Sequence, residues 1–423
     1  FRSQEYDRII NGYWFFNKGE ATYVNGIYYM YLNWWKMDVG YPKFRVPDKE
    51  LFYLVEVCDL DPRCLGLLYI TMRGVGKDLW EESIIWKEDG PIKIKDVKVG
   101  DRIYGNDGKL ITVTHRFDYN DQMQYRVEFE DGRSVECGEG HLWTLVDYNN
   151  RVKTMELREF KDDFRLGHVR KNGKRDSKYY NTFCNPVEFP KKDLIIDPYF
   201  LGIWLGDGHK HNPTITNPDQ EIIDYVQNYA NDIGLTMSEH KSTKCKTVAI
   251  TSNPGHSNPL KDKLRRLGVL NNKHIPDVYK YSSVEDRMEL LRGLMDTDGS
   301  AGPNGSVEFS TSIPRLKKDM EYLLNSLGIK FKVSSKIPTF THKGEKRTGK
   351  RSYRFKIKTG LNVFKLKRKA DRIINKGHNW TTGSRSKVGI KSITPTSVKP
   401  SVCIAVDNKD KLFLTNDFIV THN

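Results

Sequence analysis

Pro198-Tyr-Phe-Leu-Gly-Ile-Trp-Leu-Gly-Asp-Gly208 decides the central fold of this chain, because a second stretch repeats its pattern. Leu290-Leu-Arg-Gly-Leu-Met-Asp-Thr-Asp-Gly299 also sets glycine among large apolar residues, and the final acids, Asp207 and Asp298, stand 91 residues apart. Glycines in an apolar helix let a second backbone approach closely. The repeat therefore predicts two helices packed side by side, each ending in an aspartate. The glycines at the expected contact are Gly202, Gly206 and Gly293.

Each copy is followed by a β-like stretch and then by an amphipathic helix that ends in glycine. The apolar spacing predicts these helices over residues 220–234 and 314–328. A strand then resumes at Leu235 and at Ile329. One duplicated unit with acids at equivalent places predicts a pseudo-dimer around a shared site.

The two copies resemble the paired motifs of LAGLIDADG homing endonucleases over roughly residues 190–380. The resemblance implies that Asp207 and Asp298 form the catalytic, metal-binding pair of an enzyme that acts as a monomer. Two adjacent carboxylates bind hard Mg²⁺, which activates water against a phosphodiester. Asp296 takes the motif's other acid position, but its counterpart in the first copy is Leu205, so we place it outside the symmetric site.

The family also places a lysine near each half of the active site, and the sequence offers several. We expect Lys244 and Lys356 to fill these places, although a DNA-facing or solvated lysine explains each of them equally well. The other candidates are Lys241, Lys246 and Lys358.

The distribution of charge indicates a polyanion partner. The chain of 423 residues has 69 Lys and Arg against 54 Asp and Glu, a net charge of +15. Residues 191–390 alone carry +16, and residues 1–77 carry +1. A basic excess on this scale, interleaved with aromatic residues, predicts double-stranded DNA bound through its phosphates. The expected contacts are Lys343, Lys346, Arg347, Lys350, Arg351, Arg354 and Lys358.

The composition excludes several classes of protein. Hydrophobic residues make up 38% and aromatic residues 12%, which excludes wholesale disorder. No apolar run reaches the ~18 residues of a membrane span, and no signal peptide opens the chain. The six cysteines form no CxxC pair, which argues against a disulfide framework or a zinc knuckle. We expect a cytoplasmic protein without a membrane partner, cut at both ends from something larger.

Two β-rich segments, 78–190 and 391–423, flank the basic domain. Asn-Asp-Gly within residues 101–114 and Asp-Gly within residues 124–136 predict hairpins. The flanks resemble the Hint splicing domain of inteins, and Phe418-Ile-Val-Thr-His-Asn423 carries the C-terminal signature.

The intein resemblance implies a cofactor-free splicing reaction. Asn423 would cyclise onto its own carbonyl with help from His422. The upstream splice junction would lie between Lys77 and Asp78, and Asp78 is a poor acyl acceptor where most inteins begin with Cys or Ser.

Three other residues resemble the signature of class 3 inteins, in which an internal cysteine attacks the upstream peptide bond. Cys403 would be the nucleophile, and Trp143 and Thr421 would position it. His141 would strain or protonate the amide at the Lys77–Asp78 junction. Taken alone, Cys403 and Trp143 would each be explained by a structural role, since a lone Cys or Trp most often belongs to the core.

The sequence departs from the intein pattern at two places. Gly138 stands where the His-containing motif usually begins with Thr. Lys411 stands where many inteins have His, which leaves Asp407 or Asp410 as candidate helpers of Asn423 cyclisation.

Residues 1–77 resemble the N-terminal part of a phage terminase large subunit. The likeness rests on residues 28–42 and 59–66, and residues 67–77 resemble a strand that enters a P-loop, with Thr71 in place of its first glycine. A Ser or Thr just after Asn423 would serve both the P-loop and the splicing reaction. The resemblance implies a phage or prophage gene in a bacterial cell.

We therefore expect a mixed fold: an all-β Hint splicing domain split by an α+β LAGLIDADG endonuclease of tandem αββαββα-like repeats, preceded by a fragment of an α/β P-loop ATPase. The expected domains are 1–77, 78–190, 191–390 and 391–423. Expected partners are the chain's own extein segments and the uninterrupted terminase gene. The alternatives are a splicing element whose insert only binds DNA, and a terminase ATPase active in DNA packaging.

Overall fold

The computed structural model describes residues 2–17, 19–35, 46–64, 77–165, 167, 176–240, 245–342, 345–374 and 381–422. The chain separates into two compact units, Phe1–Arg73 and Gly74–Asn423. The first unit has a small aromatic core at Tyr28 and Tyr29. Its elements are α1 (Arg2–Asn11), β1 (Tyr13–Asn17), β2 (Glu20–Val24), α2 (Gly26–Trp34) and α3 (Val46–Leu60). The expected P-loop lies outside the described residues except for Lys77.

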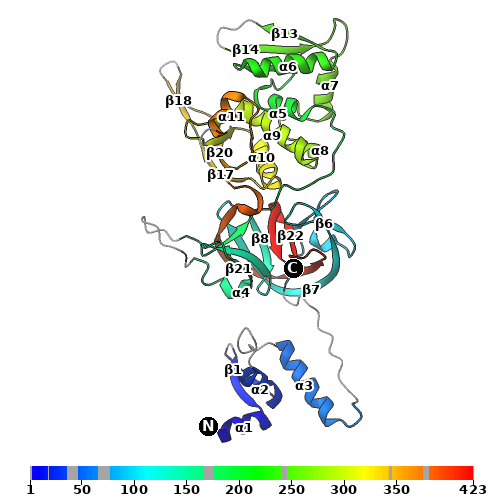
Figure 1. The fold of residues 1–423 in the computed structure, drawn as a ribbon, viewed down its shortest axis with the longest axis vertical. Helices are drawn as coiled ribbons and strands as arrows, with labels where there is room; N and C mark the ends of the chain where they lie inside the picture. The colour runs from blue at the N-terminus through cyan, green and yellow to red at the C-terminus, as the bar shows by residue number, and fades with distance from the viewer. Residues whose placement is uncertain are drawn as a thin grey trace. The chain divides into compact units, whose positions relative to one another are not determined.

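The second unit contains a β-rich part built from both expected flanks (Figure 1). Before the insertion, its strands are β3 (Leu79–Trp80), β4 (Ile84–Lys87), β5 (Gly90–Lys93), β6 (Arg102–Tyr104), β7 (Leu110–Phe129), β8 (Ser134–Gly138), β9 (Leu142–Asp147), β10 (Val152–Glu156) and β11 (Tyr179–Thr182). After the insertion come β21 (Lys387–Val406), β22 (Leu412–Thr415) and β23 (Ile419–His422). The short helices are η1 (Ile94–Asp96), α4 (Leu157–Phe160), η2 (Gly383–Arg385) and η3 (Asn416–Phe418).

Both predicted hairpins are confirmed. β6 pairs with β7 around Gly108, and β7 pairs with β8 around Gly132, at φ of 84° and 92°. A positive φ is the reason that each turn uses glycine. Strand β21 enters the same sheet between β11 and β3 and also pairs with β7 through several register shifts. The two flanks therefore form one sheet although some 200 residues separate them.

An α+β part lies between β11 and β21. Its first half holds α5 (Pro198–Asp207), β12 (Thr214–Asn217), α6 (Gln220–Asp232), β13 (Thr236–His240), β14 (Lys246–Thr251), α7 (Pro259–Arg266) and α8 (Asp277–Lys280). Its second half holds α9 (Val284–Asp298), β15 (Gly299–Ala301), β16 (Val307–Thr311), α10 (Pro314–Ser326), β17 (Lys330–Lys336), β18 (Thr339–His342), β19 (Glu345–Thr348), β20 (Ser352–Lys358) and α11 (Lys367–Ile374).

The predicted amphipathic helices are confirmed as α6 and α10, and the glycines beyond them, Gly234 and Gly328, have φ of 71° and 63°. Left-handed glycines after the last turn are the usual helix end. The strands β12-β14-β13 form one sheet, and β15-β16-β20-β17 form another. One hydrophobic core, which includes both α5 and α9, spans the two halves.

An aromatic cluster joins the β-rich and α+β parts of the second unit. The rings of Trp86 and Phe418 stack with centroids 4.1 Å apart, and the Tyr322 ring of α10 meets Phe418 at 5.2 Å. Beside this cluster, the buried Arg287 of α9 donates to the backbone carbonyls of Ser326 and Val187. The Tyr322–Phe418 contact ties α10 to the segment that carries β23, and the Arg287 bonds tie α9 to α10 and to Val187.

Candidate functional site

Strand register brings the two ends of the expected splicing domain together. β3 pairs with β21 at Trp80 and Ser401 and at Leu79 and Val402. The next pair in this register is Asp78 and Cys403. On its other side β3 pairs with β8, where Gly138 N donates to Asp78 O at 3.0 Å. The expected nucleophile and the expected scissile bond are therefore neighbours in one sheet.

The Asp78 side chain is fully buried. Its Oδ2 accepts from Gln124 Nε2 of β7 at 2.7 Å, and its Oδ1 has no hydrogen-bond partner among the described residues. A Cβ at Gly138 would lie well inside van der Waals contact with Oδ1. The departure from Thr at Gly138 thus has a physical reason, since the Asp78 carboxyl fills the space of the missing side chain.

The expected histidine lies beside the C-terminal strand. His141 is 0% exposed, and its Nε2 lies 2.5 Å from Thr421 Oγ1 of β23. Burial lowers the pKa of His141 to about 4, against the opposing effects of the Asp78 carboxyl and the Lys77 backbone. The Trp143 ring meets the imidazole edge to face at 5.6 Å. The imidazole is therefore neutral and lies near both Thr421 of β23 and the Lys77 backbone.

The Cys403 thiol is 2% exposed. Burial raises its pKa to about 12, the nearby Asp78 carboxyl adds to the effect, and Lys77 opposes it. The thiol is thus protonated near neutral pH, and it needs a proton acceptor before it can attack a carbonyl.

The C-terminal residues are described up to His422, and Asn423 lies outside the described residues. Leu412 pairs with His422 in the β22–β23 hairpin. The candidate helpers have other partners there, because Asp410 accepts from Leu412 N and Asp407 accepts from Thr112 N. The Thr112 contact holds the pKa of Asp407 below its usual value.

The two motif helices, α5 and α9, pack at their glycines, as predicted. A Cβ on Gly202 would lie 2.9 Å from Gly293 Cα, and a Cβ on Gly206 would overlap the Thr297 side chain. Real Cβ atoms do not reach such distances, so the approach of the backbones requires glycine.

This packing sets Asp207 and Asp298 at neighbouring helix ends. Burial raises the pKa of Asp298 to about 6, the Asp207 carboxylate adds to the effect, and Lys273 and Lys369 oppose it. Burial likewise raises the pKa of Asp207, while a 2.6 Å hydrogen bond from Asn217 opposes it. Two carboxylates that disfavour each other's charge, with oxygen as their only donor atom, suit a hard divalent cation that also binds water and phosphate.

The sequence interpretation missed the two lysines that the structure places beside these acids. Lys273 donates to Gly206 O at 3.0 Å, and Lys369 donates to Asp296 O at 2.6 Å and to Gly299 O at 2.7 Å. Burial lowers the pKa of each lysine to about 8. They follow Asp207 and Asp298 by 66 and 71 residues, and because these offsets differ, motif spacing alone does not identify them.

The lysines expected from the sequence lie elsewhere. Lys356 pairs with Glu308 and Lys332 on the exposed face of β20, and Lys246 donates to Gln220. Lys241 and Lys244 lie outside the described residues. The buried Asp296 accepts from Tyr199 and from backbone amides, so it has a structural role apart from the acid pair.

The expected DNA contacts occupy two surfaces. Arg354 and Lys358 lie with Lys356 on the exposed face of β20. Lys346, Arg347, Lys350 and Arg351 lie on or beside the β18–β19 hairpin, where Arg347 contacts Glu345 and Arg351 contacts Ser335. Lys350 is exposed, Lys343 lies outside the described residues, and the side chain of Lys346 is not described.

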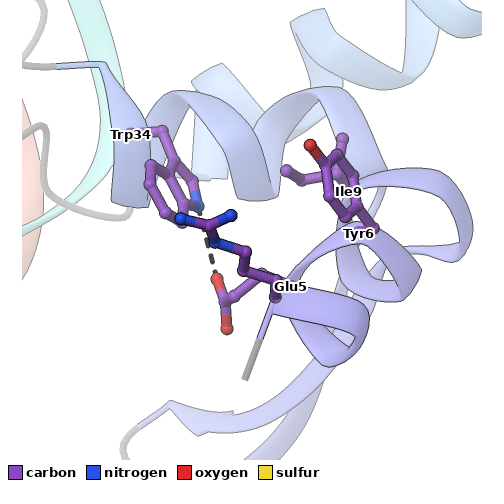
Figure 2. Close-up of a pocket in the computed structure, with 5 residues that line it drawn as sticks. Glu5, Tyr6, Ile9 and Trp34 are labelled. Atoms are coloured by element: carbon purple, nitrogen blue, oxygen red, sulfur yellow. Dashed lines mark hydrogen bonds between the residues drawn. The ribbon is translucent and has the colours of Figure 1, made fainter.

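The first unit has a pocket of about 320 Å³ that holds none of these residues. Figure 2 shows Trp34 donating to Glu5 at its wall. Every helix in the described part of the chain is too short or too polar to span a bilayer.

Residues 285–375 match the family model of the LAGLIDADG-like domain. This match covers the second acid of the pair, the second repeat and Lys369. The predicted LAGLIDADG relationship is therefore confirmed for the second half of the α+β part.

Among curated proteins, the chain is 30% identical over 380 residues to the replicative DNA helicase DnaB of Mycobacterium intracellulare. The match covers 85% of this chain and spans 61% of the relative's length. This relative is a DnaB helicase and not the terminase that residues 1–77 suggested.

Solved structures include similar chains. The Msm DnaB1 intein splicing domain, bound with zinc, matches at 11% identity and a TM-score of 0.24, covering 82% of this chain and 99% of that one. The homing endonuclease I-DmoI in complex with DNA and Mn matches at 16% identity and a TM-score of 0.26, covering 38% of this chain and 88% of that one.

Proposed function

We propose that this chain is a class 3 intein with a homing endonuclease inserted in its splicing domain. The domains would be a host segment at 1–77, splicing segments at 78–190 and 391–423, and the endonuclease at 191–390. The observation that supports splicing most strongly is the strand register that sets Cys403 beside Asp78.

In the proposed reaction, Cys403 Sγ attacks the Lys77 carbonyl carbon, and the Asp78 amine leaves. The upstream segment is then a thioester on Cys403. The first residue after Asn423, which must be a hydroxyl or thiol residue, takes the segment from Cys403. Cyclisation of Asn423, assisted by His422, releases the joined product. Trp143 packs against His141, which holds the imidazole against Thr421.

Trapping the thioester tests this reaction. In the Asn423→Ala chain, which blocks cyclisation, we expect a small thiol to release residues 1–77. Cys403→Ala should abolish the release, while Cys245→Ala, a half-buried cysteine of the α+β part, should leave it unchanged. Release that persists in Cys403→Ala contradicts the class 3 assignment.

We further propose that the α+β part cleaves double-stranded DNA as a pseudo-dimer within one chain. Asp207 and Asp298 would hold Mg²⁺, which lowers the pKa of bound water and offsets charge at the phosphate. Lys273 and Lys369 keep the two helix ends in place through backbone carbonyls and bring positive charge to the acid pair. The basic face of β20, with Lys356, would meet DNA phosphates.

Cleavage of matched DNA fragments tests both the nuclease and the host. One linear fragment would carry an uninterrupted terminase gene and the other an uninterrupted DnaB helicase gene, since these are the two host candidates. We expect one to be cut with Mg²⁺, and Asp207→Asn or Asp298→Asn to abolish cutting. Asp232→Asn, an exposed acid at the end of α6, is the control. Binding without cutting by the unaltered chain would favour the alternative, an insert that only binds DNA.

A further inference from the structure

The Asp78 carboxyl is a buried proton acceptor that the proposed splicing steps leave unused. Its Oδ2 is held by Gln124, and its Oδ1 has no hydrogen-bond partner among the described residues. A fully buried carboxyl with a bare oxygen is costly to keep in a core. Such a cost indicates a function for the group rather than a contribution to packing.

The surroundings of Asp78 identify the proton that it can accept. In the strand register its neighbour on β21 is Cys403 and its neighbour on β8 is Gly138, and its charge also acts on the Cys137 thiol. His141 and Lys77 are the other titratable groups near it, and Gln124 of β7 is uncharged. Among the described residues, two charged groups act on the Cys403 thiol, Asp78 and Lys77. Lys77 is a cation and cannot accept a proton, so the Asp78 carboxylate, the neighbour of Cys403 in the strand register, is the acceptor of the thiol proton.

His141 is less suited to this step. Its Nε2 is engaged by Thr421 Oγ1, and its other interactions are with Asp78, His422 and the Lys77 backbone. It therefore lies at the Lys77 backbone and the C-terminal strand, while Asp78 is the cross-strand neighbour of Cys403.

We propose that the Asp78 carboxylate carries the proton of the Cys403 thiol to the departing Asp78 amine. This inference rests on the proposed splicing function. The S–H proton passes to Asp78 Oδ1 as Sγ bonds to the Lys77 carbonyl carbon. When the bond from that carbon to Asp78 N breaks, the same carboxyl returns the proton to its own α-amine, so the step neither gains nor loses a proton. Gln124 is the positioning residue, because its hydrogen bond occupies Oδ2 and leaves Oδ1 without a partner among the described residues.

The pH dependence of thioester formation tests the proposal. Thiol-released cleavage would be measured in the Asn423→Ala chain from about pH 6 to about pH 9. Asp78→Asn keeps the shape and the Gln124 contact but removes the base, so we expect the rate near pH 7 to fall at least ~100-fold. The remaining rate should rise about tenfold per pH unit, because the thiolate then forms only through hydroxide. Asp118→Asn, an exposed acid paired with Val402 on the same sheet, should keep the original rate and profile.

Two further variants separate the outcomes. Asp78→Asn with Asn423 intact, followed by Thr and a short tag, should still release the tag segment by Asn423 cyclisation, which shows that it folds. If Asp78→Asn fails to release this segment, Gln124→Met tests the role of Asp78 instead. We expect its rate of thioester formation to fall ~10-fold, with the same steeper pH profile. An unchanged rate and slope in the folded variant overturns the role of Asp78 while Cys403-dependent splicing stands. Release that persists in Cys403→Ala overturns the splicing proposal itself.

Discussion

At several positions of this protein, the neighbouring side chain decides which residue type can be accommodated. Gly138 and Asp78 are the clearest pair, because the carboxyl of one occupies the volume that a side chain on the other would need. The sequence flagged both as departures from a family pattern, but only the strand register shows that one departure makes room for the other. Cross-strand neighbours cannot be identified from one sequence when the partner strand lies hundreds of residues away.

We predict that Gly138→Ala destabilises the full chain by about 1–3 kcal/mol, the usual cost of overpacking a core. In an Asp78→Ala background the same change should cost little, because the overlapping carboxyl is gone. Thermal unfolding of the four chains in a double-mutant cycle measures the coupling. Equal costs in both backgrounds would show that the two side chains do not compete for space.

A second prediction concerns Asp298, whose folded pKa of about 6 exceeds the unfolded value of about 4. A raised carboxyl pKa means that the folded chain binds this proton more tightly than the unfolded chain. Folded-state stability is therefore lost as pH rises from about 4 through about 6 when no metal is bound. Asp298→Asn should melt at a higher temperature than the unaltered chain at pH 7 in a chelator, and the gap should close toward pH 4.

Mg²⁺ should raise the melting temperature of the unaltered chain and leave Asp298→Asn unchanged, because only a bound ligand shifts the folding equilibrium. Asp232→Asn is the control for a lost exposed acid. If Asp298→Asn melts lower at every pH, the carboxyl contributes to folding and the predicted repulsion with Asp207 is absent.

At the scale of elements, the repeat predicted the important contact. The glycines of α5 and α9 do meet, and helices α6 and α10 form where the apolar spacing placed them. The lysines beside the acid pair were harder to predict from the sequence. Lys273 reaches the pair from a loop and Lys369 from α11, so tertiary packing rather than motif spacing brings them there. The β-rich part was predictable as hairpins, whereas the pairing of β21 with both β3 and β7 was not.

We predict that Gly202→Ala disrupts the α5–α9 contact, because its Cβ would overlap the Leu290 carbonyl. The expected cost is about 1–3 kcal/mol, with loss of DNA cleavage and retention of thioester formation. Gly234→Ala is the matched control, since its Cβ meets nothing within 4 Å and only its φ of 71° is strained. If Gly202→Ala still cleaves DNA, the geometry of the acid pair does not depend on close packing of α5 against α9.

At the scale of the second unit, the inserted α+β part buttresses the C-terminal strand. Asp417 and Phe418, just before β23, have φ of 49° and 61°, which is unfavourable for residues other than glycine. The Phe418 ring is held between Trp86 and Tyr322, so an α10 side chain supports a strained turn five residues before Asn423. This contact could not be predicted from the sequence, because it joins the β-rich part to the inserted α+β part.

We predict that Tyr322→Ala slows Asn423 cyclisation several-fold while thioester formation on Cys403 changes little. The physical reason is that loss of the ring relaxes the strained turn next to β23 and leaves β21 untouched. Tyr353→Ala, a half-buried tyrosine of β20 that packs against the core of the α+β part and not against the Trp86–Phe418 cluster, is the control. Equal slowing of both steps would indicate a general loss of stability instead.

The most direct test of the central claim is the intact mass of the products formed when Thr and a short tag follow Asn423. The account predicts a ligated product of residues 1–77 and the tag, together with the excised segment from Asp78 to Asn423. It predicts that Cys403→Ala yields neither. Ligation that continues in Cys403→Ala would contradict attack by this thiol, and the absence of ligation in the unaltered chain would contradict splicing.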